Sequence, residues 1–114
     1  MSEKSNGADD SLGELFEMLS HEYRRRLLIA VGQSNPRDED ELTSESIADG
    51  ETDESLAMLR QELYHTHLPK LADAGFINWD HDTGIITRGP RFDEVEPLLR
   101  LMHEHQSELP DDWP

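Results

Sequence analysis

The chain has 114 residues, among them 26 aspartates and glutamates but only 10 lysines and arginines, so its formal net charge is −16. This length is typical of a single domain. The absence of cysteine excludes disulfides, thiolate catalysis and thiolate metal sites. Strong negative charge has the wrong sign for nucleic-acid binding at ordinary ionic strength.

The acidic excess accompanies a near-absence of lysine, because only Lys4 and Lys70 are found. This composition resembles that of proteins from salt-loving archaea, which hold molar salt inside the cell. At molar salt the Debye length is about 3 Å, so distant repulsion is nearly absent. The same salt removes most of the counterion release that favours DNA binding. The charge therefore weakens a DNA-binding interpretation without excluding it.

The N-terminal residues 1–10 are polar and lack the basic and apolar parts of a signal peptide. No apolar run approaches the roughly 20 residues that cross a bilayer. We therefore expect a cytoplasmic protein that makes no membrane contact. The expected organisation is a disordered acidic tail over 1–10, one domain over 11–107 and a loose acidic tail over 108–114.

Two helices are expected first, over about 11–19 and 21–32, with Ser20 as the N-cap of the second and Gly32 at its end. A loop over 33–41 follows. In the first helix Leu12, Leu15, Phe16 and Leu19 recur at helical spacing, and in the second Leu27, Leu28 and Val31 are expected to face inward.

A short helix over 42–50, with Thr43 as its cap, is expected before a longer helix over 53–72 that follows Thr52 and is closed by Gly75. One face of the longer helix carries a stripe for the core. Its members are Leu56, Leu59, Leu63, His67 and Leu71.

After Gly75 the period changes, because residues 76–80 alternate, 81–84 are turn residues and 85–88 are rich in β-branched side chains. This pattern predicts a β-hairpin. A last helix is expected over 93–107, with Pro97 in its first turn. The order of elements is that of a winged helix-turn-helix: mainly α with a β-hairpin wing, flanked by N- and C-terminal helices.

The segments "HLPKLADAGFI" and "NWDHDTGIITRG" resemble the winged-helix regulators of archaea and bacteria, including the ArsR-like group. The variant "LYHTHLPKLADAGFI", with "LSHEYRRRLL" upstream, is most similar to a haloarchaeal winged-helix family of unknown function. The resemblance covers residues 14–102 and implies a DNA-binding transcriptional regulator.

Two features depart from that pattern. The connection "GETDESLAMLR" is longer and more acidic than the tight turn of an ordinary helix-turn-helix. Pro69 removes an amide that would bond to the carbonyl of His65, at a cost of about 3 kcal/mol in a helix interior. We therefore expect the helix to bend or to end early there.

The outward side chains of the 53–72 helix are the candidate readers of the major groove: Arg60, Gln61, Tyr64, His65 and Thr66. Arginine makes forked bonds to guanine, and glutamine makes them to adenine. Lys70 is a candidate phosphate contact. Any helix exposes some arginine and glutamine, so a merely solvated face is the alternative.

In the wing, Arg88 and Arg91 can reach phosphate or the minor groove, although either can instead pair with nearby acids. The arginines at 24–26 are expected to fan around their helix and to pair with carboxylates on the surface.

Metal binding and catalysis have little support. His65 and His67 are two residues apart, as are His103 and His105, which places the members of each pair on different helix faces. His67 is expected to be a hydrogen-bonded packing residue. No nucleotide-binding or nucleophile motif is found, so we expect a non-enzyme without metal or cofactor. The chain lacks the thiolates that are typical of a metal-sensing regulator, so this class is a distant alternative.

A homodimer is expected, through apolar residues of the first and last helices. The candidate interface residues are Leu12, Leu15, Phe16, Leu19, Val95, Leu98, Leu99 and Met102. The leading function is sequence-specific binding of double-stranded DNA by this dimer. The alternative is a winged-helix module for protein interaction that does not bind DNA.

Overall fold

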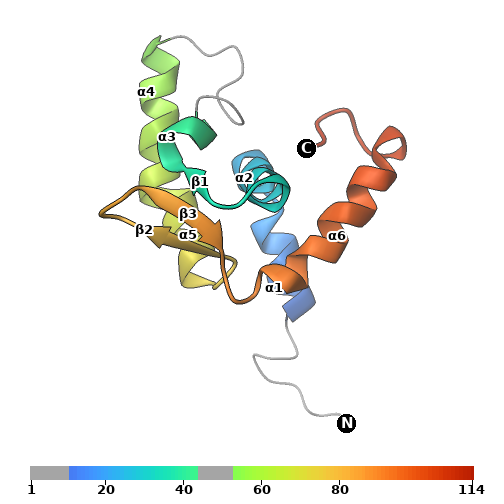
Figure 1. The fold of residues 1–114 in the computed structure, drawn as a ribbon. Coiled ribbons are helices and arrows are strands. Elements are labelled where there is room, and N and C mark those ends of the chain that lie inside the picture. The colour runs from blue at the N-terminus through green and yellow to red at the C-terminus, as the bar shows by residue number, and fades with distance from the viewer. Residues whose placement is uncertain (1–10, 44–52) are drawn as a thin grey trace.

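A computed structural model describes residues 11–43 and 53–114. Helices predominate, and a three-stranded antiparallel sheet has the order β1-β3-β2. In Figure 1, α1 and α2 lie between α6 on one side and the sheet with the α4–α5 helix on the other. This winged-helix arrangement confirms the predicted fold class. The elements are α1 Ser11–Met18, α2 Glu22–Gln33, β1 Arg37–Asp38, α3 Glu39–Glu41, α4 Asp53–Glu62, η3 Leu63–His67, α5 Leu68–Asp73, β2 Ile77–Asp80, β3 Ile85–Arg88, α6 Phe92–Glu104 and η4 Gln106–Glu108.

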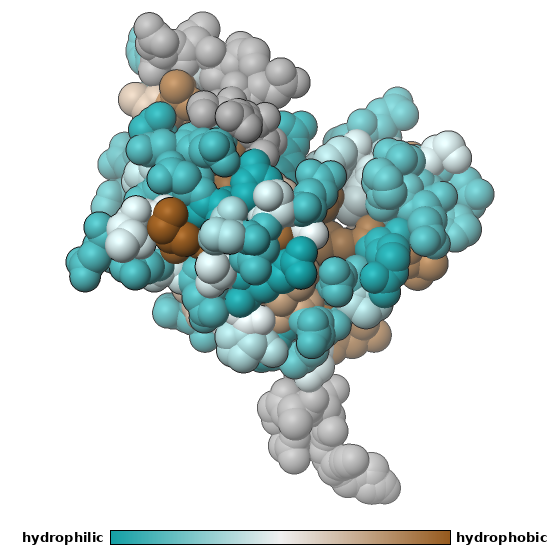
Figure 2. Space-filling view, in the orientation of Figure 1, coloured by the Kyte–Doolittle hydropathy of each residue, from teal (hydrophilic) through white to brown (hydrophobic). Residues whose placement is uncertain are grey.

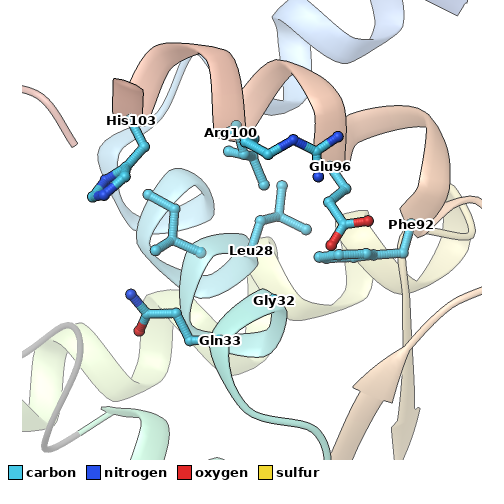
Figure 3. Close-up of a pocket in the computed structure, with 9 residues that line it drawn as sticks. Leu28, Gly32, Gln33, Phe92, Glu96, Arg100 and His103 are labelled. Carbon is cyan, nitrogen blue, oxygen red and sulfur yellow. The ribbon is translucent and has the colours of Figure 1, made fainter. Parts of the chain in front are cut away.

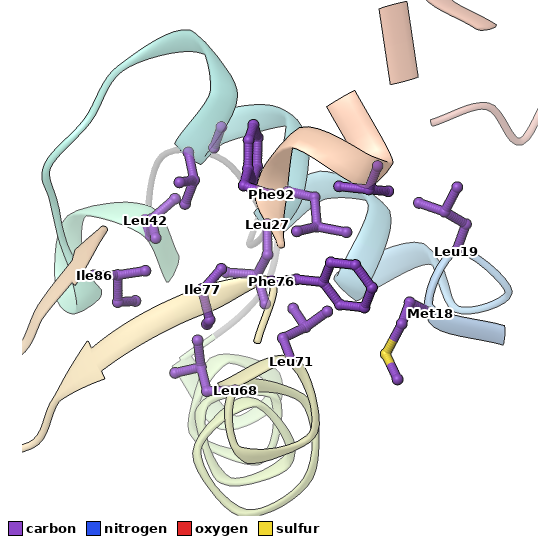
Figure 4. Packing of buried hydrophobic residues seen from close by; sticks show 14 of the residues in the cluster. Met18, Leu19, Leu27, Leu42, Leu68, Leu71, Phe76, Ile77, Ile86 and Phe92 are labelled. Atoms are coloured by element: carbon purple, nitrogen blue, oxygen red, sulfur yellow. The ribbon is translucent and has the colours of Figure 1, made fainter. Parts of the chain in front are cut away.

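A single hydrophobic core joins the helices to the inner face of the sheet (Figure 4). Phe76 and Phe92 are its largest side chains, and both are almost completely buried. The predicted inward residues of α2, which are Leu27, Leu28 and Val31, are all buried here. The close packing of apolar side chains from α1, α2, the α4–α5 helix, β2, β3 and α6 fixes the hairpin against the helices.

The helix that begins at Asp53 runs on to Asp73, so the expected early end at Pro69 is wrong. Its middle, η3, is a π-helical turn in which the amide of Leu68 bonds to the carbonyl of Leu63, five residues earlier. Pro69 follows this turn directly, and its missing amide falls where the α-helical bonding pattern is already interrupted. Proline is therefore accommodated within the helix.

Gly75 ends this helix as predicted, with φ of +89° and the amide of Phe76 bonded to the carbonyl of Leu71 at 3.0 Å. Such a positive φ favours glycine. The predicted hairpin follows, with Ile77 opposite Arg88 and Asp80 opposite Ile85. Its turn needs Gly84, whose φ is +74°.

The predicted loop over 33–41 is wrong, because it contains β1 and α3. Arg37 pairs with Ile86 and Asp38 with Ile85 at the free edge of β3. The carboxylate of Asp38 then caps α3 by accepting from the amides of Asp40 and Glu41. Thr43 is therefore no N-cap, and its hydroxyl instead donates to the carbonyl of Glu39.

Two details of the helix ends also differ from prediction. His21, not Ser20, caps α2, because its Nδ1 accepts from the amide of Tyr23 at 3.1 Å. The last helix begins at Phe92, which places Pro97 inside α6 and beyond its first turn.

The segment 108–114 folds back onto the domain, unlike the expected loose tail. Trp113 packs against the core, and the carbonyl of Pro114 accepts from Arg25 at 3.4 Å. The predictions for residues 1–10, for the helix over 44–50 and for the cap at Thr52 lie outside the described residues.

Candidate nucleic-acid interface

The outer face of the α4–η3 helix is polar and solvent-exposed at its centre. Gln61, His65 and Thr66 are exposed there, beside Met58, which is 66% exposed. On the opposite face of the same helix, Leu59, Leu63 and His67 are buried. Because the inner face is packed against the core, three of the predicted base-reading side chains on the outer face point to solvent, as a major-groove helix requires.

Arg60 and Tyr64, the other two predicted readers, are held by one carboxylate. Asp40 Oδ1 accepts from Arg60 Nη1 at 3.2 Å and from the hydroxyl of Tyr64 at 2.9 Å. Burial, together with the hydrogen bond and charge of Asp40, raises the pKa of Tyr64 to about 12. The acidic α3 segment therefore binds part of the surface that was predicted for DNA.

Lys70, the predicted phosphate contact of this helix, lies at the junction with α1. Its Nζ is 3.2 Å from a carboxylate oxygen of Glu17. Both side chains are well exposed, so solvent and salt weaken this pair and it contributes little to stability.

Arg88, the first predicted wing arginine, turns back toward α2. Its guanidinium donates to the carbonyls of Val31 at 3.3 Å and Gly32 at 2.7 Å, and it lies 5.5 Å from the ring centroid of Phe92. The last carbonyls of a helix lack partners within the helix, and a cation near them is favourable. Arg88 therefore caps α2 rather than pointing outward from the wing.

Arg91 is also engaged within the domain. It makes two 3.0 Å hydrogen bonds to the carboxylate of Glu94, an ion pair of 2.7 Å with Glu14, and a bond to the carbonyl of Ala74. These contacts raise the pKa of Arg91 further and lower that of Glu94. The sequence left open whether the wing arginines face DNA or pair with nearby acids. Arg91 pairs with acids, whereas Arg88 binds backbone carbonyls of α2.

The tip of the hairpin is acidic but internally ordered. Asp80 Oδ1 accepts from the amides of Asp82 at 2.9 Å and Thr83 at 3.3 Å, which shapes the turn. His81 stacks on Trp79 with 4.0 Å between ring centroids. The tip therefore offers a carboxylate, Asp82, and an aromatic pair, and no cation.

The sequence analysis missed a buried polar junction behind this helix. Arg24 is only 7% exposed and donates to the carbonyls of Met18 and Glu17 and to Nδ1 of His67, the last at 3.1 Å. Of the three adjacent arginines, Arg26 alone pairs with a carboxylate of the described residues, that of Glu22 at 2.8 Å. Arg25 instead donates to the carbonyl of Leu19. Helical periodicity does separate Arg24 from its neighbours, because it lies three, four and seven residues before Leu27, Leu28 and Val31, which were predicted to face inward.

His67 is the hydrogen-bonded packing residue that was predicted. It is 3% exposed, and its ring stacks on His21 with 4.1 Å between centroids. Since a guanidinium only donates, Nδ1 is the acceptor and the proton is on Nε2, which has no partner in the described part of the chain. Burial, then the charges of His21, Arg24 and Lys70, lowers the pKa of His67 to about 4.

The residues predicted for a dimer interface separate into two groups. Leu15, Leu19, Val95 and Leu99 belong to the core of the protomer, so they are unavailable to a partner in this structure. Leu12 and Phe16 are 59% and 55% exposed. Leu98 and Met102 are half-buried.

Within residues 11–43 and 53–114, no three histidine, aspartate or glutamate side chains gather as metal ligands. No helix in the same ranges is long and apolar enough to cross a bilayer.

Comparison with known proteins gives a family but no described relative. No curated protein and no solved structure matches the chain. The model of one family, a domain of unknown function designated DUF7344, matches residues 16–87, which include every element from α2 to the end of the hairpin except the last residue of β3. The chain therefore belongs to the DUF7344 family.

Proposed function

We propose that the protein is a DNA-binding transcriptional regulator that places its α4–α5 helix in the major groove. The observation that supports this most directly is the row formed by Gln61, His65 and Thr66, which is exposed on a helix whose other face is packed. Gln61 can pair with adenine, and His65 and Thr66 can contact base edges or phosphate.

The cations near this row have limited roles in the proposal. Arg60 and Lys70 are each held by one partly exposed ion pair, which a phosphate can replace at small cost. Arg88 and Arg91 bond to backbone carbonyls and are needed by the fold. Few phosphates are then neutralised, so binding depends weakly on salt concentration.

A homodimer would set the spacing of two half-sites. Of the residues predicted for the interface, Leu12 and Phe16 on α1 are the ones that stay well exposed and could make such contact. Phe16 also borders a hollow of about 280 Å³ together with Met102 and Trp113, which extends this apolar surface onto α6 and the folded-back tail.

The test is fluorescence anisotropy with duplex DNA from upstream of the protein's own gene, titrated from low to molar KCl. We expect saturable, sequence-preferring binding that persists at high salt. Gln61→Ala and Arg60→Ala are expected to weaken it, whereas Gln106→Ala, a change at an exposed residue of η4, leaves it unchanged. Absence of sequence preference at every salt concentration would refute the proposal.

A second function, a protein-interaction module, is favoured by the charges around the same row. Glu54, Glu62 and Asp73 are exposed along the helix, and within residues 11–43 and 53–114 none of them pairs with a cation. Met58 adds an exposed apolar group beside Gln61. If the DNA titration fails, a basic protein surface is the expected partner of this face.

A further inference from the structure

A hollow of about 290 Å³ lies between α2 and α6. Figure 2 shows hydrophobic atoms within it, and Figure 3 shows its lining side chains. Leu28, Ile29, Phe92 and Leu99 form an apolar floor. Its volume is at the lower end of the range of small-molecule sites, roughly 300–1,000 Å³.

The rim of this hollow carries both charges. Arg100 and Glu96 lie one turn apart on α6 and both line the hollow, as do His103 and Gln33. In Figure 3, Glu96 is next to Phe92 and Arg100 is one turn further along. The rim therefore combines an acid, a base and two further hydrogen-bonding side chains around an apolar floor.

Arg100 differs from the other cations of the described residues. Each of the remaining eight, in residues 11–43 and 53–114, has a hydrogen bond or an ion pair within the protein. Arg100 has none in those ranges, and neither has Glu96, although a spacing of four residues on a helix favours pairing. Among the residues that the structure describes, Arg100 is thus the one arginine without an internal partner, and it lies beside an apolar hollow.

We propose that this hollow binds a free α-amino acid with an apolar side chain. The α-carboxylate would accept from Arg100, and the α-ammonium would donate to Glu96. The side chain would lie on the floor, where Leu28 and Phe92 are already buried, so the apolar surface removed from water is mainly that of the ligand itself. Opposite charges on a small ligand match the opposite charges of the rim, whereas a simple carboxylate would also meet the repulsion of Glu96.

Gly32 contributes to the floor through its lack of a side chain. A Cβ there would lie 3.2 Å from Cζ of Phe92, so glycine lets this ring approach α2 without displacement.

The test uses calorimetric titration of the free protein with L-phenylalanine, 3-phenylpropanoic acid, which lacks the ammonium, and phenethylamine, which lacks the carboxylate. We expect L-phenylalanine to bind at least about tenfold more tightly than either analogue, because each analogue loses one charge-assisted hydrogen bond. Amide chemical shifts are expected to move in α2 and α6 and to stay in place in the hairpin.

Arg100→Gln and Glu96→Gln are each expected to weaken L-phenylalanine at least about tenfold, and Arg100→Lys to restore part of the loss. Glu104→Gln is the matched control, because Glu104 is exposed on α6 without lining the hollow. Equal binding of the three compounds, no saturable binding, or a dimer that covers these residues would overturn the proposal. DNA is absent from this experiment, so its result is independent of the proposed regulatory function.

Discussion

His65 and His67 stand two residues apart on one helix and have opposite surroundings. His65 is exposed on the outer face, whereas His67 is 3% exposed on the inner face, bonded to Arg24 and stacked on His21. The inner junction holds α1, α2 and η3 together through bonds that water cannot easily replace. The outer face has polar groups that solvent satisfies. The same residue type thus serves the fold on one side and is available for binding on the other.

The largest effect that distinguishes the two faces is expected from Arg24→Ala. This change leaves the carbonyls of Glu17 and Met18 and Nδ1 of His67 without their shared donor, in a buried place. We expect a loss of about 3–5 kcal/mol in the free energy of unfolding, measured by urea denaturation.

Arg26→Ala, two residues along α2, is the matched control for Arg24→Ala. It removes an exposed pair with Glu22 and is expected to cost less than about 1 kcal/mol. Equal losses in the two variants would contradict the distinction between the inner junction and the surface.

Acidification is expected to weaken the inner junction. His67 has a folded pKa of about 4 against an ordinary value of 6.5. Between these values the unfolded chain takes up a proton that the folded chain excludes, so stability present above pH 6.5 is lost as the pH falls toward 4. The loss amounts to roughly 3 kcal/mol.

His67→Gln separates this effect from the titration of the carboxylates. The glutamine side chain keeps an acceptor for Arg24 but does not titrate. Urea midpoints between pH 7 and pH 4 give the difference in stability between the natural protein and the variant. This difference should shrink as the pH falls, because only the natural protein is destabilised by protonation of His67. A constant difference would show that protonation of His67 does not destabilise the fold.

A smaller effect is expected at Asp40, which lies beside the outer face. Asp40→Asn removes the charge that helps to raise the pKa of Tyr64 to about 12, and burial retains the rest of the shift. Ultraviolet titration of the phenols should show one of the two tyrosines ionising at lower pH. If Arg60 binds phosphate, the same change is expected to increase DNA affinity.

The smallest effect on stability is expected on the outer face itself. Gln61→Ala, His65→Ala and Thr66→Ala remove side chains that are exposed, so each should change the unfolding free energy by less than about 0.5 kcal/mol. Their effect should appear in DNA binding alone. A loss of stability like that of Arg24→Ala would show that this face supports the fold.

Much of the architecture follows from local patterns. The apolar spacing of α2 and of the 53–73 helix, the glycine at 75 and the β-branched residues at 85–87 predict elements that the structure contains. The strand β1 could not be predicted, because Arg37 and Asp38 have no strand preference and pair only where β3 offers a free edge. A two-residue strand of this kind is a product of tertiary contact.

The candidate site was harder to predict than the fold. Positions of Gln61, His65 and Thr66 follow from helical periodicity once the inner face is known. The carbonyls that Arg88 and Arg91 bind do not follow from periodicity, because they lie at helix ends 17 or more residues away in sequence. Of the three adjacent arginines Arg24 alone is buried, and its place on the helical face of Leu27 and Leu28 could have indicated this, whereas its partners could not be read from the sequence.

The π turn at Leu63–His67 keeps the buried stripe on one side of the helix. Residues that repeat every four positions drift by about 40° per step around an α-helix, because each residue advances about 100°. From Leu59 through Leu63 and His67 to Leu71 this drift would reach about 120°, yet all four are buried. The extra residue of the π turn offsets about 100° of this drift. Deleting one residue there would turn the two ends of the helix against each other and expose one end of the stripe.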